Sequence, residues 1–144
     1  KKQLTNYLGY DTSPEWSLDG NKIAYGSGNL SNLDTWTMNP DGSDKKQLTS
    51  GALVTDYDWS PDGRKIAYVA WLTKDPKAKE IWIIDADGVN KKLLLSIPCD
   101  PSRVGIGLAW SPDGLKIAFD CYMIGVVNSD IYVIDVPATK EVKR

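Results

Sequence analysis

Histidine is absent from all 144 residues of this chain, which removes most of the usual catalytic machinery. Without an imidazole there is no Ser-His-Asp or Cys-His pair, no histidine ligand for zinc and no histidine general base. The chain also lacks a Gly-x-Ser-x-Gly nucleophile elbow, a Walker-type loop and a dinucleotide fingerprint. Carboxylate pairs alone can hydrolyse glycosides, but nothing selects such a pair here. The sequence therefore predicts a protein that is not an enzyme and that uses no cofactor.

Two carboxylates do stand at a spacing that suits ligand binding. Asp56 and Asp58 flank Tyr57, and residues two positions apart on a strand point to the same face of the sheet. Together they could bind a cation or a basic group at the mouth of a channel. Two carboxylates are too few to hold calcium without other oxygen ligands, so we expect no metal site.

The elements that position these side chains are indicated by a decapeptide that occurs three times. Its copies are Trp16–Tyr25, Trp59–Tyr68 and Trp110–Phe119, and the second reads Trp-Ser-Pro-Asp-Gly-Arg-Lys-Ile-Ala-Tyr. The period is roughly 40 to 50 residues, which is the typical length of one four-stranded propeller blade. Such a repeat predicts an array of equivalent structural units.

Each copy is followed by a second segment that is typical of a strand. These segments are rich in β-branched and aromatic residues, and each opens with an acid. They are Asp34–Asn39, Glu80–Asp85 and Asp130–Asp135. In the first two repeats an Asp-Gly turn comes next and leads into a polar-to-apolar stretch, Lys46–Thr49 and Lys92–Leu95. Each repeat therefore contains four expected strands, which we name a to d.

The turn between strands a and b follows from its residue types. In the Ser-Pro-Asp-Gly of residues 60–63, proline presets φ at the second position of a type I turn. Serine can bond the local backbone at the first position, and glycine suits the fourth. The first repeat replaces the proline by Leu18 but keeps Asp-Gly. We therefore expect these aspartates to form turns and not to catalyse.

In these residues the repeat resembles the TolB-type propeller repeat, which runs approximately Trp-Ser-Pro-Asp-Gly-x-x-Ile-Ala-Phe, then Asp-Ile-Tyr, Asp-Gly and Leu-Thr. The resemblance covers nearly the whole chain. It implies a non-catalytic, protein- or peptide-binding β-propeller in the periplasm or elsewhere outside the cytoplasm. Similar repeats precede the catalytic domains of prolyl-oligopeptidase-type serine peptidases. The alternative is therefore a propeller segment that gates such a peptidase.

We expect one all-β domain over residues 1–144, a β-propeller segment of three four-stranded antiparallel blades that is half of a six-bladed propeller. The expected blades are residues 6–49, 50–95 and 96–144. Lys1–Thr5 matches Lys45–Thr49 residue for residue, so residues 1–5 are expected to be strand d of a preceding or swapped blade. Both ends of the sequence are those expected for a piece of a longer protein. The start alone would also suit a mature envelope protein after removal of its signal peptide.

Three blades are too few for a closed ring, because propellers use about four to eight. The first and last blades would each expose an apolar face that is built to pack on a neighbour. Further blades of a longer chain could cover these faces. Two copies could also close head to tail, with residues 1–5 of each copy supplying strand d to the other. The sequence thus predicts either further blades or a homodimer.

Composition fits a single folded domain and excludes some partners. A hydrophobic content of 42% against 25% charged residues is not that of a disordered chain. The net charge is −2, and basic residues cluster only in pairs such as Lys45-Lys46, which argues against a nucleic-acid partner. No stretch of about 18 apolar residues is present, so we expect no membrane span.

Loop lengths indicate which side of the propeller binds a partner. The a–b and c–d connections are tight turns on one side, whereas insertions collect in the b–c and d–a connections on the other side, and binding sites are commonly built from such loops. Trp71 lies outside the repeat positions and is either a contact anchor or folded over its own loop. The candidate binding residues are Trp71, Lys74, Asp75, Asp56, Asp58, Arg103, Tyr122 and Met123.

Two further features lie at this loop side. The apolar segment Tyr122–Val127 either extends strands b and c of the third blade or forms an exposed patch for a partner. Cys99 and Cys121 are the only cysteines and fall near the same end of one blade. They are either bridged, in an oxidising compartment, or two free and partly buried thiols.

The tryptophans at repeat positions are expected to fill the core between blades. They are Trp16, Trp36, Trp59, Trp82 and Trp110.

Overall fold

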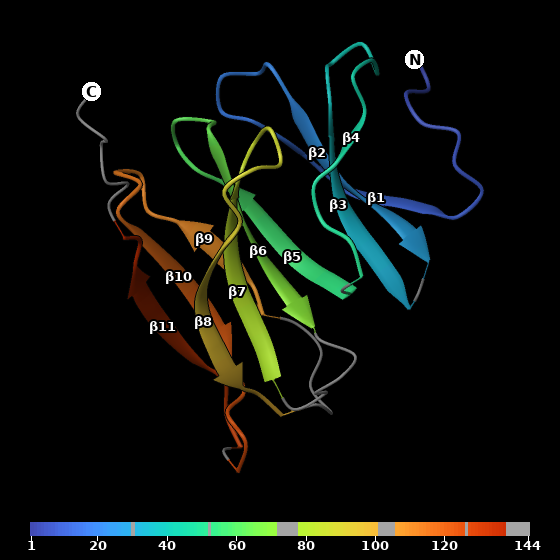
Figure 1. Cartoon of the computed structure of the whole chain (residues 1–144). Helices are drawn as coiled ribbons and strands as arrows, with labels where there is room; N and C mark the ends of the chain where they lie inside the picture. Colours follow the sequence, from blue (N-terminus) through green and yellow to red (C-terminus); the bar gives the residue numbers. More distant parts are fainter. Residues whose placement is uncertain (30, 52, 72–77, 101–105, 126, 138–144) are drawn as a thin grey trace.

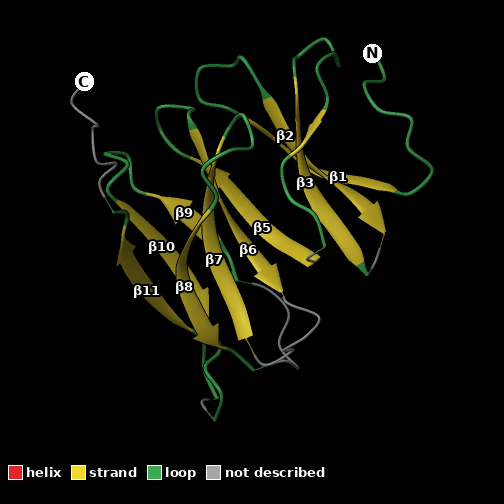
Figure 2. Ribbon diagram, in the orientation of Figure 1, coloured by secondary structure: helices red, strands yellow, loops and turns green. Residues whose placement is uncertain are grey.

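The computed structural model describes residues 1–137 except 30, 52, 72–77, 101–105 and 126. The described residues form strands, turns and loops and contain no helix (Figure 2). Three antiparallel sheets lie side by side in chain order (Figure 1). The chain is thus all-β and forms a partial propeller, as the sequence predicts.

Each sheet contains one repeat, and we call the sheets blade one, blade two and blade three. Blade one contains β1 (Tyr10–Trp16), β2 (Ile23–Asn29), β3 (Asn32–Met38) and β4 (Lys46–Gln47). Blade two contains β5 (Leu53–Trp59), β6 (Lys65–Trp71), β7 (Ala78–Asp85) and β8 (Lys92–Pro98). Blade three contains, within the described residues, β9 (Leu108–Trp110), β10 (Lys116–Cys121) and β11 (Asp130–Asp135). Successive strands pair in sequence order in all three sheets.

The Asp-Gly turns between the first two strands of each blade have the predicted geometry. In blade two the amide of Gly63 donates to the carbonyl of Ser60 at 2.8 Å, and the glycine φ is 66°. The Asp62 carboxylate accepts bonds from the Ser60 hydroxyl and the Arg64 amide. The equivalent bond from Ser111 lowers the pKa of Asp113. These aspartates therefore hold turns, as expected.

The blades pack through alternating faces of their strands. We call the side of a blade that faces the preceding blade its leading face and the other side its trailing face. The leading face of blade two carries Ile66, Tyr68 and Ile84, which pack with Ala24 and Leu48 of blade one.

The trailing face of blade two carries Ala67, Ile81 and Ile83 and packs against blade three. Its partners there include Ile117 and Phe119. Ile117 and Phe119 stand in their repeat where Ile66 and Tyr68 stand in blade two. The same residue pattern therefore forms both junctions between blades.

The N-terminal residues lie on the leading face of blade one. Lys1–Thr5 is not in a strand, and the first strand, β1, begins at Tyr10. Leu4 nevertheless packs on Ile23, Tyr25 and Met38, the blade-one counterparts of the residues that Leu48 covers in blade two. Contrary to the expectation of an exposed apolar flank, these three side chains are buried.

One core prediction is wrong. Trp59 is only 5% exposed, and its indole donates to the carbonyl of Glu15 in the preceding blade at 3.3 Å. Trp16 occupies the same repeat position but is 56% exposed, because no blade precedes its own in the described structure. Trp36, Trp82 and Trp110 are half-buried.

Some expected boundaries also differ. β8 continues to Pro98, so the boundary expected after residue 95 falls inside this strand. β10 ends at Cys121 and β11 begins at Asp130, so the described residues 122–125 and 127 do not extend strands b and c. Ile124 and Val127 are exposed there. The last expected strand d falls on residues 138–144, outside the described residues.

Candidate binding site

The two carboxylates singled out in the sequence connect two blades. Asp56 and Asp58 both lie on β5. One oxygen of Asp56 accepts a bond from the Leu108 amide at 2.7 Å, and one oxygen of Asp58 accepts a bond from the Trp110 amide at 2.6 Å. Both amides belong to β9. The sequence predicts that these carboxylates are available to a cation or a basic group. In the structure, one oxygen of each already binds the backbone of blade three.

A third carboxylate, Glu15, joins this pair and was missed in the sequence. It is half-buried and lies close enough to Asp58 for the two carboxyl groups to interact. Burial, followed by the charge and hydrogen bond of Asp58, raises the pKa of Glu15 to about 7. Burial also raises the pKa of Asp56. Glu15 precedes Trp16 as Asp58 precedes Trp59, so alignment of the repeats would have identified it.

These three acids do not form a metal site. Within the described residues, no group of three or more His, Cys, Asp or Glu is arranged to hold a metal ion. A carboxyl with a pKa near 7 that faces another carboxylate holds a proton at neutral pH about as often as it carries a charge. The cluster is thus a point of inter-blade contact with its own pH dependence.

The loop-side candidates are only partly described. Trp71 is the last residue of β6, is half-buried, and has the ammonium of Lys79 5.3 Å from its ring centroid. Tyr122 and Met123 directly follow β10 and are half-buried. The structure brings Met123 into the core cluster between blades two and three. Lys74, Asp75 and Arg103 lie outside the described residues.

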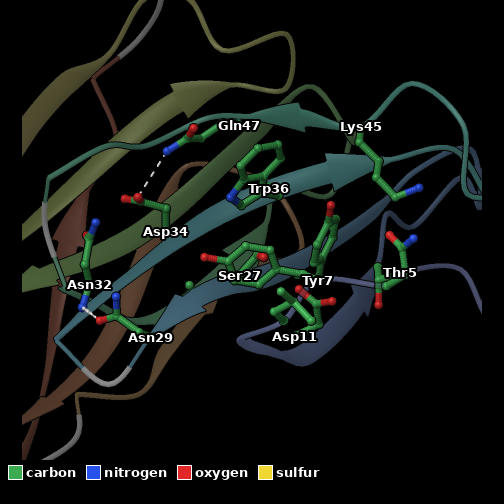
Figure 3. Close-up of a pocket in the computed structure, with 14 residues that line it drawn as sticks. Thr5, Tyr7, Asp11, Ser27, Asn29, Asn32, Asp34, Trp36, Lys45 and Gln47 are labelled. Atoms are coloured by element: carbon green, nitrogen blue, oxygen red, sulfur yellow. Dashed lines mark hydrogen bonds between the residues drawn. The ribbon is translucent and has the colours of Figure 1, made fainter.

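A hollow lined by the aromatic side chains of Tyr7, Tyr25 and Trp36 lies on the leading face of blade one (Figure 3). Its volume is about 560 Å³, and the side chains of Tyr7, Asp11 and Trp36 gather around it. Asp34 also lines the hollow; it is buried and accepts bonds from Gln47 at 3.0 Å and Thr49 at 3.1 Å. Burial raises the pKa of Asp34 in spite of these bonds.

The equivalent place in blade two is filled. There Tyr68 is fully buried beneath blade one, and the Lys91 ammonium lies 5.6 Å from the centroid of the Tyr68 ring and 4.5 Å from that of Trp82. Tyr68 and Trp82 are the counterparts of Tyr25 and Trp36 in the hollow. The hollow therefore marks the place that a preceding blade occupies elsewhere in the same chain.

Comparison with known proteins finds TolB by both sequence and structure. The chain is 34% identical, over 69% of its length, to the Tol-Pal system protein TolB of Gluconobacter oxydans, of which it spans 22%. The crystal structure of TolB from Acinetobacter baumannii matches 92% of the chain and 31% of that protein, with a TM-score of 0.72 and 22% identity. The chain is a TolB-like β-propeller segment.

This chain also matches proteins that are not called TolB, among them a peptidase and a lyase. The chain is 30% identical, over 74% of its length, to the uncharacterized peptidase YuxL of Bacillus subtilis, of which it spans 16%. An oligogalacturonate lyase in complex with manganese matches 88% of the chain and 34% of that protein, with a TM-score of 0.68 and 22% identity. No family model matches the chain. The fold therefore does not assign a function by itself.

The relatives are longer than this TolB-like segment. An uncharacterized protein of Agrobacterium fabrum is 27% identical over 83% of the chain, yet the chain spans only 43% of that protein. In the described part of the chain, no helix has the length and apolar character that a membrane crossing requires.

Proposed function

We propose that this segment is a non-catalytic protein- or peptide-binding module of the TolB type that works in the periplasm or another extracytoplasmic compartment. It completes its ring by docking TolB-like blades on the leading face of blade one and the trailing face of blade three. For the isolated chain, the docking partner is a second copy. The lack of histidine and of nucleophile motifs, together with the TolB relatives, supports the absence of catalysis.

The observation that carries this proposal is a contrast between repeat-equivalent residues. Ile81 and Ile83 on the trailing face of blade two are 0% and 6% exposed, because blade three covers them. Their counterparts in blade three, Ile131 and Val133, are 75% and 58% exposed. An exposed apolar sheet face of this kind is typical of an interaction surface.

The trailing face of blade three and the leading face of blade one have the same residue pattern as the two faces that pack together inside the chain. The trailing face of blade two packs on the Ile117 and Phe119 side of blade three. Blade one has Ile23 and Tyr25 at the same repeat positions, where the N-terminal residues bury them, beside the hollow and the exposed Trp16. Blade three of one copy can therefore meet blade one of another in the arrangement already present inside the chain. With two copies the ring of about six blades closes, so the contact does not propagate.

Strand exchange would accommodate the N-terminal residues in this ring. Leu4 already occupies, relative to blade one, the place that Leu48 occupies relative to blade two. Lys2 also donates to the carbonyl of Asp41 at 2.7 Å. We propose that Lys1–Thr5 supplies the outer strand of the blade that docks there.

A single substitution on the open face tests the proposal. We expect the native chain to have about twice the 15.9 kDa mass of one chain in multi-angle light scattering at tens of micromolar concentration. Ile131→Glu places a charge in the proposed contact and should give monomers. Val127→Glu is the matched control, because Val127 is at least as exposed as Ile131 but lies in a loop outside the sheet face. A monomeric native chain, or equal dissociation of both variants, would overturn the proposal.

A second candidate function has support from the relatives. The match to an uncharacterized peptidase of Bacillus subtilis and a 32% identity over 56% of the chain to dipeptidyl-peptidase 5 of Porphyromonas endodontalis favour a propeller segment that gates a serine peptidase. The open reading frame distinguishes the two functions. A downstream catalytic domain with a nucleophile elbow would favour the peptidase.

A further inference from the structure

The two cysteines lie almost within bonding distance of each other. The Sγ atoms of Cys99 and Cys121 are 2.7 Å apart, and both residues are buried. Both thiols are free in the structure. A disulfide has a sulfur–sulfur distance of about 2.0 Å, so a sulfur shift of roughly 0.7 Å joins them.

The backbone keeps these two residues together. Cys99 follows β8 and forms an isolated antiparallel bridge with Met123, which lies just beyond β10. Next to it, the amide of Asp100 donates to the carbonyl of Tyr122 at 2.9 Å. Cys121 ends β10 and packs with Cys99 in the core cluster between blades two and three. Backbone pairing next to Cys99 and core packing of Cys121 therefore both hold the two sulfur atoms close together.

We propose that Cys99 and Cys121 are joined by a disulfide bond when the chain folds in an oxidising compartment, with a low-molecular-weight or protein disulfide as the oxidant. One cysteine thiolate attacks a sulfur of the oxidant and releases one thiolate, which leaves a mixed disulfide. The second cysteine thiolate then attacks the bonded cysteine sulfur and releases the other half of the oxidant. The two cysteines lose two protons and two electrons, and the oxidant gains them as two thiols.

The surroundings of the pair determine when this reaction takes place. Burial and the neighbouring Cys121 raise the pKa of Cys99 to about 12, although the charge of Lys79 acts in the opposite direction. A buried thiol with a high pKa reacts slowly because the thiolate is the attacking species. We therefore expect the bond to form during folding rather than in the folded protein.

The bond would fasten blade three to blade two. Cys99 follows the last strand of blade two, and Cys121 ends a strand of blade three, 22 residues further along the chain. The crosslink would also fix Tyr122 and Met123, two of the candidate binding residues. The proposal stands independently of self-association, because both cysteines belong to one chain.

Refolding in a defined redox buffer tests the proposal. The chain is unfolded and refolded with a mixture of oxidised and reduced glutathione, then unfolded again and treated with iodoacetamide for intact-mass analysis. We expect no alkylation and a mass lower by two hydrogens, and two alkylated sites after reduction. We also expect the oxidised chain to melt about 10 °C above the reduced chain, because closure of a loop of this size restricts the unfolded state.

The double variant Cys99→Ala/Cys121→Ala is the matched control. Its melting temperature should be the same with and without reductant, and this comparison within one variant excludes any effect of the substitutions on folding. Two free thiols after refolding in the glutathione buffer would overturn the proposal. A disulfide-linked dimer on a non-reducing gel in place of the internal bond would do so as well.

Discussion

Blade two and the two outer blades have nearly the same repeat but very different surroundings. In blade two both faces are covered, and Tyr68, Ile66 and Ile81 are completely buried. In the part of the chain that the structure describes, the N-terminal residues alone cover the leading face of blade one, and blade three exposes its trailing face. The comparison shows that a blade residue is core or surface according to its neighbours and not according to its own sheet. Substitutions at equivalent positions measure this difference directly.

The largest effect is expected at the tryptophan of the first strand. Trp59→Ala should lower the free energy of unfolding by about 3 to 5 kcal/mol, because it removes a large buried side chain from the junction of blades one and two. Trp16→Ala should cost less than about 1 kcal/mol, because Trp16 is mostly exposed. Urea unfolding followed by circular dichroism, at concentrations where the chain is monomeric, measures both. Equal losses would show that Trp16 is part of a core.

An intermediate effect is expected on the trailing faces. Ile81→Ala should destabilise the monomer by about 2 to 5 kcal/mol, because it leaves a cavity between blades two and three. Ile131→Ala, at the equivalent position of blade three, should change stability by no more than about 0.5 kcal/mol under the same dilute conditions. The same urea titration tests this pair. A loss above 2 kcal/mol for Ile131→Ala would contradict the open face.

The smallest effect is expected at Glu15, where blade one meets blade two. Its pKa is about 7 in the folded chain and 4.5 ordinarily, so the folded state binds the proton more tightly than the unfolded state. Stability is therefore greatest below pH 4.5 as far as Glu15 is concerned, and this contribution is lost as the pH rises through 7. Because Glu15 is only half-buried and solvent screens part of its interactions, we expect a loss of only about 1 kcal/mol.

Glu15→Gln separates this contribution from the other acids. Glutamine does not titrate, so the decline in stability between pH 5 and pH 8 should become smaller by about 1 kcal/mol. Urea midpoints at the two pH values measure the difference. Aspartates such as Asp113, with a lowered pKa, lose their contribution only at lower pH and do not obscure the result. An unchanged pH dependence in the variant would show that Glu15 titrates normally.

The features predicted best from the sequence depend on local residue types. The Ser-Pro-Asp-Gly turn at residues 60–63 contains the residues that form it, and its hydrogen bonds stay within six residues. The strand pattern and the all-β fold follow from the repeat for the same reason. Alignment of the three copies also places Glu15 at the repeat position of Asp58.

The features that the sequence does not predict depend on contacts between blades. The bond from the Trp110 amide to Asp58 joins residues 52 positions apart, and it requires the relative offset of two sheets that no local pattern encodes. The exposure of Trp16 depends on which blade lies beside it, and so does that of Ile131. For Trp71, half-buried beside Lys79, the sequence left two interpretations, and its role in binding a partner remains a prediction.

The carboxylates of Asp56 and Asp58 have a consequence for solubility. Among the described residues, β9 pairs with β10 on one side only, so the amides of its other side belong to an unpaired strand edge. Such an edge is a template on which a strand of another molecule can add and start aggregation. Asp56 and Asp58 occupy the amides of Leu108 and Trp110 with side-chain oxygens, which cannot extend a sheet. Neutral alanines at these two positions would leave the edge of β9 open to an incoming strand.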